Sequence, residues 1–249
     1  MICRIIAVIT FFLCSVAYAL DFQVYTEQFP PYNFTEGNKV TGVSTEIVET
    51  VLKTAGFTYE IKVITWPKAL ETVKTTPGTL LYSTGRSKER EPLFKWVGPI
   101  VPKTNSVFAL TSRSDIKVEK LDDLKKYKIG TTKDDFREQY LITKGFKLNE
   151  HLFSVGGAEP NSWNLKKLIS SNIDLWPMPD AVAHYLLKKE NIDAKTIRRV
   201  IYLDEINGDG YFIAVNKSVP DETVAKLKDS LDSLKKKGVL QDIWKKYGL

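Results

Sequence analysis

The sequence predicts an α/β protein of two similar lobes in tandem, each a mixed sheet flanked by helices. Two observations lead to this prediction. Short apolar segments typical of strands alternate with segments that have the helical period, and this alternation occurs twice along the chain. The 249 residues are also enough to bury the cores of one or two domains. Small ligands bind at the carboxyl ends of strands in such sheets, so we expect the cleft between the lobes to bind a ligand.

The first alternation reads as strand, helix, strand, helix and strand, an order typical of a largely parallel sheet covered by helices. Pro30 and Pro31 predict an extended turn after the first strand. Ser44 or Thr45 is placed to cap the first helix, and Gly56 to end it. The expected strands are residues 21–26, 57–64 and 80–83, and the expected helices are residues 44–55 and 67–74.

The second alternation predicts a second α/β unit. Asp135 and Glu138 resemble a capping box at the start of a helix that Gly145 ends. Asp180 is placed to cap a later helix, and the chain closes with one amphipathic helix over residues 224–244. The expected strands are residues 107–110, 127–132, 153–155, 173–176, 202–203 and 211–215, and the other expected helices are residues 121–124, 136–141, 163–169 and 181–188.

The N-terminus has the pattern of a secretory signal peptide. A single charge, Arg4, precedes an apolar run, and residues 17–19 fit a cleavage site after Ala19. The run is short for a transmembrane anchor. Cys3 and Cys14 both lie in this segment, so the mature chain is expected to have neither disulfides nor thiol chemistry. We therefore expect a periplasmic protein.

Composition and motifs exclude several functions. The signal segment carries one of the 36 basic residues, so the net charge of +6 becomes +5 in the mature chain. The lysines are spread along helical segments, which is typical of solvated helix faces rather than of nucleic-acid binding. His151 and His184 have no metal-ligand spacing, and no phosphate loop or nucleophile elbow is present. We expect no metal, no cofactor and no nucleic-acid partner.

The segment from Ser83 to Arg90 carries the clearest binding chemistry. Ser83, Thr84 and Gly85 place hydroxyls and backbone N–H groups after an apolar strand. Arg90 then supplies a planar fork of donors that suits a carboxylate held by two parallel hydrogen bonds. This combination is suited to binding a small carboxylate-bearing molecule.

These residues, with residues 29–32, Gly42, Phe94 and a C-terminal run over residues 219–248, resemble the solute-binding proteins of polar amino-acid ABC transporters, family 3. The resemblance covers nearly all of the mature chain. It implies the two-lobe periplasmic binding protein fold (type II), with two hinge crossings. The implied division is a signal peptide over residues 1–19, one lobe over residues 20–109 plus 210–249, and the other lobe over residues 110–209.

The resemblance also implies roles for residues of the first lobe. Arg90 matches the arginine that clamps a ligand carboxylate, the alternative being an ion pair with Glu89 or Glu91. Phe29 and Trp66 match positions that sandwich the ligand side chain, the alternative being core packing. The other expected site residues of this lobe are Glu27, Tyr32, Ser83, Thr84 and Gly85, the last standing where many members have a hydroxyl residue.

The second lobe departs from the family pattern. Lys133, Asp134, Asp135 and Phe136 stand where amino-acid binders have Gly-Thr-Thr or Gly-Thr-Ser, whose hydroxyl and N–H groups meet the ligand carboxylate. Asp135 would repel an anion there, and we favour the alternative that it only caps its helix. Asp180 either binds a ligand amine or caps a helix, and Trp176 lies nearby in sequence. These departures suggest an aromatic or cationic ligand rather than a standard α-amino acid.

We therefore expect a monomeric periplasmic protein that captures an amino acid or a related amine or carboxylate compound by hinge closure. Its expected partner is an ABC permease of the inner membrane. Two alternatives share the scaffold. One is an enzyme resembling cyclohexadienyl dehydratase, in which Glu27, Asp135 or Asp180 would act as general acid. The other is a sensory module that hands its ligand to a receptor.

Overall fold

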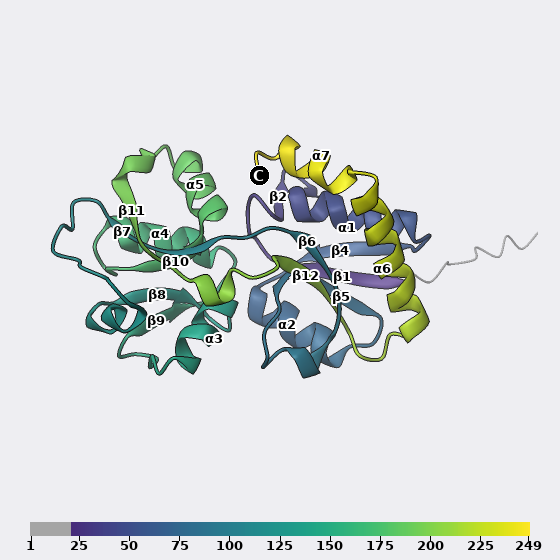
Figure 1. Ribbon diagram of the computed structural model, residues 1–249, viewed down its shortest axis with the longest axis horizontal. Helices are drawn as coiled ribbons and strands as arrows, with labels where there is room; N and C mark the ends of the chain where they lie inside the picture. Colours follow the sequence, from purple (N-terminus) through teal and green to yellow (C-terminus); the bar gives the residue numbers. More distant parts are fainter. Residues whose placement is uncertain (1–20) are drawn as a thin grey trace, which may run out of the picture.

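The computed structural model describes residues 21–249. They form two lobes joined by two crossing segments (Figure 1). The signal-peptide prediction and both cysteines lie outside the described residues. None of the helices in residues 21–249 is long and apolar enough to cross a membrane.

The first lobe is built on a five-stranded mixed sheet. Its strands are β1 (Phe22–Thr26), β4 (Tyr59–Val63), β5 (Thr79–Gly85), β6 (Lys95–Val101) and β12 (Tyr211–Val215). They lie in the order β4-β1-β5-β12-β6. Strand β1 pairs in parallel with β4 and β5, which confirms the predicted parallel unit, whereas β12 pairs antiparallel with β5 and β6.

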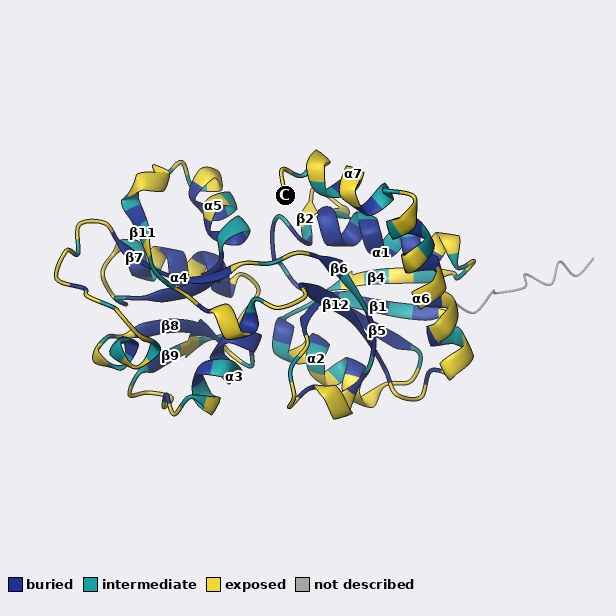
Figure 2. Ribbon diagram, viewed as in Figure 1, coloured by how far each residue is buried: buried dark blue, intermediate teal, exposed yellow. Residues whose placement is uncertain are grey.

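Four helices and a hairpin complete this lobe. They are α1 (Val43–Thr54), α2 (Trp66–Thr75), α6 (Asp221–Lys236), α7 (Val239–Lys246) and the hairpin of β2 (Phe34–Glu36) and β3 (Lys39–Thr41). Helices α1 and α7 cover one face of the sheet, and α2 covers the other (Figure 1). The central strands β5 and β12 are buried along their whole length, as expected for strands that are covered on both faces (Figure 2).

The second lobe contains two smaller sheets. Strand β7 (Asn105–Leu110) lies between β10 (Trp176–Pro179) and β11 (Ile197–Tyr202), both antiparallel to it. Strands β8 (Ile129–Thr132) and β9 (Leu152–Val155) pair in parallel. The helices are α3 (Phe136–Thr143), α4 (Pro160–Ile169) and α5 (Asp180–Lys189). Short 3-10 segments lie at Glu91–Leu93, Leu121–Lys126, Ala194–Thr196 and Asp204–Ile206.

The chain passes between the lobes at residues 102–104 and again at residues 203–210. Among the described strands, β6 pairs only with β12, and β7 pairs only with β10 and β11, so the chain changes sheets between Val101 and Asn105. This first crossing falls a few residues before the expected boundary at residue 110. It was misplaced because β6 and β7 are both apolar strands and only two residues of the short link between them, Pro102 and Thr104, are exposed.

Several local expectations are wrong. The expected strand at residues 202–203 is only the end of β11, which begins at Ile197. The first helix has Gly42 as its N-cap, rather than Ser44 or Thr45. Strand β10 begins at Trp176, three residues after the expected start at residue 173. The C-terminal run is two helices, because Gly238 adopts a left-handed backbone with φ 77° between them. Residues 83–85 continue β5 instead of forming a turn after it.

Gly42 makes a close backbone approach that fixes the start of α1. Its φ is 111°, and a Cβ added there would lie 2.5 Å from the carbonyl oxygen of Tyr32. That oxygen accepts a hydrogen bond from the N–H of Ser44 at 2.8 Å. The residue 29–32 turn is thereby attached to the helix N-terminus, next to the edge of the sheet that faces the second lobe.

We expect Gly42→Ala to lower the free energy of unfolding by about 3 kcal/mol, since it combines backbone strain with a backbone clash. Gly56→Ala is the matched control, because Gly56 has φ 76° but no atom within 4 Å of an added Cβ. That control should cost about 1–2 kcal/mol. Urea unfolding measures both variants, and equal losses would contradict the role of the close approach.

Candidate ligand-binding site

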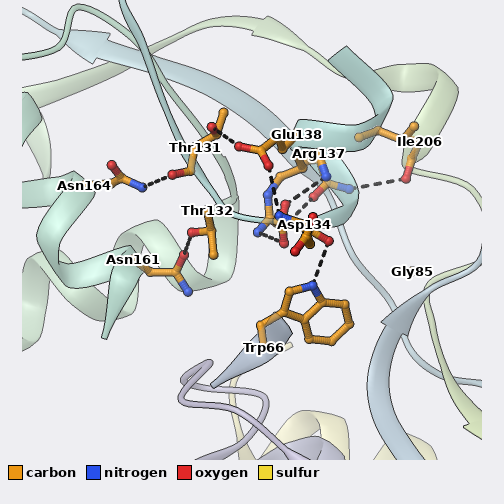
Figure 3. A network of polar contacts seen from close by, with 12 residues as sticks. Trp66, Gly85, Thr131, Thr132, Asp134, Arg137, Glu138, Asn161, Asn164 and Ile206 are labelled. Carbon is orange, nitrogen blue, oxygen red and sulfur yellow. Dashed lines mark hydrogen bonds and ion pairs between the residues drawn. The ribbon is translucent and has the colours of Figure 1, made fainter. Parts of the chain in front are cut away.

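The candidate site lies where strand ends of the first lobe meet the N-terminus of α3 in the second lobe (Figure 3). The parallel strands β1 and β5 end at the same edge of their sheet, which brings Glu27 and Gly85 to this boundary. From the opposite side, β8 leads directly into residues 133–135 and then into α3. Many of the expected site residues therefore lie in loops or at the ends of strands and helices where the two lobes face each other.

Arg90 crosses the boundary between the lobes. Its side chain is buried, with 4% of the residue exposed. Nη1 donates to the carbonyl of Gly85 at 3.2 Å, and Nη2 donates to the carbonyl of Asp134 in the second lobe at 2.9 Å. The guanidinium lies 5.3 Å from the centre of the Trp66 ring and 5.6 Å from that of Phe136. Burial lowers the pKa of Arg90 to about 10, which leaves it charged at neutral pH.

The alternative of an ion pair between Arg90 and Glu89 or Glu91 is wrong, because Arg90 makes no ion pair within residues 21–249. Glu91 instead pairs with Arg86, at 2.7 Å from its Nη2. The donors of Arg90 are thus directed to two backbone carbonyls, one in each lobe. A ligand carboxylate is a stronger acceptor than either carbonyl, since it carries a negative charge and can accept two parallel hydrogen bonds from the guanidinium.

The carbonyl of Asp134 is the acceptor that connects the lobes. The indole Nε1 of Trp66 also donates to it, at 2.8 Å (Figure 3). Asp134 has φ 59°, a left-handed conformation that asparagine and aspartate tolerate better than most residues. Its N–H donates to the carboxylate of Glu138 at 2.9 Å, which fixes the turn that presents the carbonyl.

Asp135 caps α3, as the favoured interpretation of the sequence predicts. Its carboxylate accepts from the backbone N–H of Arg137 at 2.8 Å and pairs with the guanidinium of Arg137 at 2.8 Å. Arg137 is 3% exposed, and its guanidinium lies 5.5 Å from the centre of the Phe29 ring in the first lobe. Nη1 also donates to the hydroxyl of Tyr211 at 3.4 Å. Arg137 was not predicted as a site residue, although its place in the first turn of α3 indicated that it would face the cleft.

Phe136 fills the space beside Gly85. A Cβ added to Gly85 would lie 2.5 Å from Cγ of Phe136, so the glycine admits a ring from the other lobe. This contact gives a physical reason for glycine where the family resemblance places a hydroxyl residue. Lys103, in the crossing segment, lies over the same ring, with Nζ 4.5 Å from its centre. Lys103 was also missed, because it lies in a link that the sequence does not distinguish from the flanking strands.

Glu27 is enclosed at the end of β1, with 8% of the residue exposed. Burial, followed by repulsion from Asp135, raises the pKa of its carboxyl to about 8. The guanidinium groups of Arg137 and Arg90 act in the opposite direction. Glu27 is therefore mostly protonated at neutral pH and can donate a hydrogen bond.

We expect Glu27→Gln to change how stability depends on pH. Between pH 4.5 and pH 8 the unfolded chain releases the Glu27 proton and the folded protein keeps it, so stability of the natural protein falls as pH rises through this range. The free energy of unfolding of the glutamine variant should therefore fall by about 4 kcal/mol less than that of the natural protein over this range. Urea unfolding at pH 5 and pH 8.5 measures the difference, and parallel pH curves for the two proteins would contradict the assignment.

The other expected site residues have varied positions. Ser83 and Thr84 are buried in the last residues of β5, and Tyr32 stacks on Phe29 with ring centres 5.3 Å apart. Lys133 is exposed. Trp176 is fully buried in the core of the second lobe and packs against Phe108.

Asp180 does not cap α5. Pro179 is the N-cap of this helix, and the Asp180 carboxylate pairs with Arg199 of β11. The second alternative for Asp180, contact with a ligand amine, stays a prediction. A ligand amine would compete with Arg199 for this carboxylate.

Two cavities open beside the contact between the lobes. One, of about 370 Å³, is lined by residues of both lobes that include Arg90 and Asp134. The other, of about 400 Å³, is lined by Phe136 and Tyr140 on one side and by residues 86–89 on the other. No group of three or more His, Cys, Asp or Glu side chains in residues 21–249 is arranged to hold a metal ion.

Two lobes, two crossings and a buried arginine between them define a two-lobed binding protein. The sequence pattern of the bacterial extracellular solute-binding proteins, family 3, matches residues 23–249. The chain therefore belongs to this family. A comparison with curated protein sequences found no significant match.

Solved structures share the fold at low sequence identity. A histidine kinase sensor domain similar to periplasmic binding proteins superposes with a TM-score of 0.78 and 20% identity, covering 91% of this chain and 95% of that one. An ancestral arginine-binding protein bound to arginine superposes with a TM-score of 0.77 and 22% identity, covering 91% of this chain and 97% of that one. An ancestral amino-acid-binding protein described as a precursor of cyclohexadienyl dehydratase superposes with a TM-score of 0.73 and 19% identity, covering 91% of this chain and 94% of that one. At these identities the likeness concerns the fold alone.

Proposed function

We propose that this protein captures a small carboxylate-bearing solute, an amino acid or a related compound, between its lobes and delivers it to an ABC permease. It works as a monomer in the periplasm, after removal of the signal peptide. The observation that carries the proposal is Arg90, which is buried at the lobe boundary and donates to one carbonyl in each lobe. Similar solved structures support the ligand class, since they include an arginine-binding protein and the substrate-binding protein of an amino-acid ABC transporter.

Closure of the lobes supplies the means of capture. In an open state, Arg90 and Trp66 lose their shared acceptor, the carbonyl of Asp134, and become free to bind a ligand. A ligand that contacts both lobes binds the closed state more tightly and shifts the population toward it. The permease then recognises the closed form.

A thermal-shift screen tests this function. The panel contains the α-amino acids, short carboxylates, aromatic acids, small peptides and polyamines. A compound present at 100 times its dissociation constant adds about 2.7 kcal/mol of stability, which is several degrees in midpoint for a protein of this size. We expect at least one carboxylate-bearing compound to give such a shift. A panel without any shift would contradict capture of this class of solute.

The enclosed carboxyl of Glu27 supports a second candidate function, that of an enzyme like cyclohexadienyl dehydratase. A protonated carboxyl enclosed beside Arg137 and Arg90 has the character of a general acid. Release of phenylpyruvate from prephenate, followed by absorbance, distinguishes the two candidates. We expect the natural protein to show no turnover of prephenate. If it did, and Glu27→Gln abolished that turnover, the enzyme would be favoured.

A sensory role is the remaining alternative. A receptor as the binding partner, in place of a permease, would support it.

A further inference from the structure

Three cationic side chains converge on the boundary between the lobes. Arg90 and Lys103 flank the Phe136 ring, with Cζ of Arg90 5.6 Å and Nζ of Lys103 4.5 Å from its centre. Lys103 Nζ also lies 5.1 Å from the centre of the Tyr211 ring, and Arg137 donates to the hydroxyl of that tyrosine. The three cations therefore form an arc spaced by two aromatic rings.

The carboxylates around these three cations do not neutralise their positive charge. Asp135 is already paired with Arg137, and the raised pKa of Glu27 leaves it mostly protonated at neutral pH. Within residues 21–249, Lys103 has no carboxylate at ion-pair distance. Two further acidic groups act from the rim, the half-buried Asp134 and the exposed Asp209, where water screens them. The enclosed groups thus carry an excess of about two positive charges.

We propose that the solute is a dicarboxylate that needs no amino group, with one carboxylate on Arg90 and the other between Lys103 and Arg137. This inference rests on the proposed function and specifies its ligand. An enclosed excess of positive charge is costly, and a dianion cancels it while accepting charge-assisted hydrogen bonds. Lys103 and Arg137 are then specificity-determining residues.

The same contacts argue against the cationic ligand that the sequence suggests. The ring of Phe29, an expected platform for a ligand cation, already carries the guanidinium of Arg137. The carboxylate of Asp135, an expected partner for such a cation, is occupied by the same guanidinium and by the N–H of Arg137. The chain therefore supplies its own cation at the position where a cationic ligand would bind.

Isothermal titration calorimetry on the purified protein tests the proposal. The probes are succinate, glutarate and adipate, with butyrate and valerate as monoacid controls and with glutamate and arginine as amino acids. We expect one of the dicarboxylates to bind at least tenfold more tightly than either monoacid and more tightly than arginine. Glutamate, which adds an amino group to glutarate, should show no advantage over it.

Variants of Lys103 locate the second carboxylate. Lys103→Met should weaken dicarboxylate binding at least tenfold, and Lys103→Arg should retain most of it. Lys128→Met, at an exposed residue just before β8, should not change it. The thermal midpoint without ligand should not fall in Lys103→Met, because no ion pair is lost. Dicarboxylate binding that is unchanged in Lys103→Met would overturn the proposed site.

The outcomes separate this inference from the function on which it rests. Tighter binding of glutamate than of glutarate, or tight binding of arginine, would overturn the dicarboxylate and leave solute capture in place. If neither these probes nor any compound of the wider thermal screen bound, both would fail.

Discussion

Replacing Arg137 by methionine is expected to lower the free energy of unfolding by about 3–5 kcal/mol, the largest stability effect that the structure predicts. The substitution keeps a long apolar side chain but leaves the Asp135 carboxylate enclosed without its cation. Removing one partner of a buried ion pair costs this much because the remaining charge is still desolvated. The loss also includes the contact of the guanidinium with the Phe29 ring. Urea unfolding measures the change.

The double variant Arg137→Met/Asp135→Asn identifies the cause. Asparagine keeps a side-chain oxygen for capping α3 but carries no charge, so the double variant should recover most of the lost stability. Arg86→Met is the matched control for an arginine in an exposed ion pair, and it should cost less than about 1 kcal/mol. Equal losses in the single and double variants would contradict the buried-charge explanation.

Arg90→Met is expected to weaken solute binding at least 100-fold, the largest functional effect. The substitution removes every donor of the fork, and about 2.7 kcal/mol corresponds to this change in affinity. Arg90→Lys should recover little, because an ammonium cannot make two parallel hydrogen bonds to one carboxylate. Calorimetric titration with the compound that gives the largest thermal shift measures the affinity.

Two comparisons show whether the loss of solute affinity in Arg90→Met comes from the binding site itself rather than from reduced stability. Arg86→Met, four residues earlier and half-exposed, should bind with the affinity of the natural protein. The thermal midpoint of unliganded Arg90→Met reports the cost of losing the interlobe hydrogen bond to Asp134. If Arg90→Met kept full affinity for the solute, Arg90 would not be a ligand-binding residue.

Most of the fold could be predicted from local patterns. Periodicity placed β1, β4, β5, β12, α1 and α2 of the first lobe within a few residues, but it did not predict β6 or the hairpin of β2 and β3. The capping residue Asp135 marked the start of α3. The errors fall where tertiary contacts override local signals. Gly42 caps α1 because its backbone meets Tyr32, and β10 begins late because its residues 176–179 pair with β7. Neither contact has a signal in the sequence near it.

The candidate site was predicted less completely than the fold. Arg90 was identified by its type and its distance from the end of β5, and the structure places it at the lobe boundary. Arg137 and Lys103 were missed because their importance depends on which groups face them across the cleft. The capping role favoured for Asp135 is confirmed, but the ion pairs that both Asp135 and Asp180 make with arginines of the same lobe were not predicted.

Hydrogen exchange measured by mass spectrometry tests the central claim, capture of a solute between the lobes. It compares the protein alone with the protein saturated by the compound that gives the largest thermal shift. We expect slower exchange in residues 83–90 of the first lobe and, together with it, in residues 131–138 of the second. Protection confined to one lobe, or located away from both segments, would contradict capture between them.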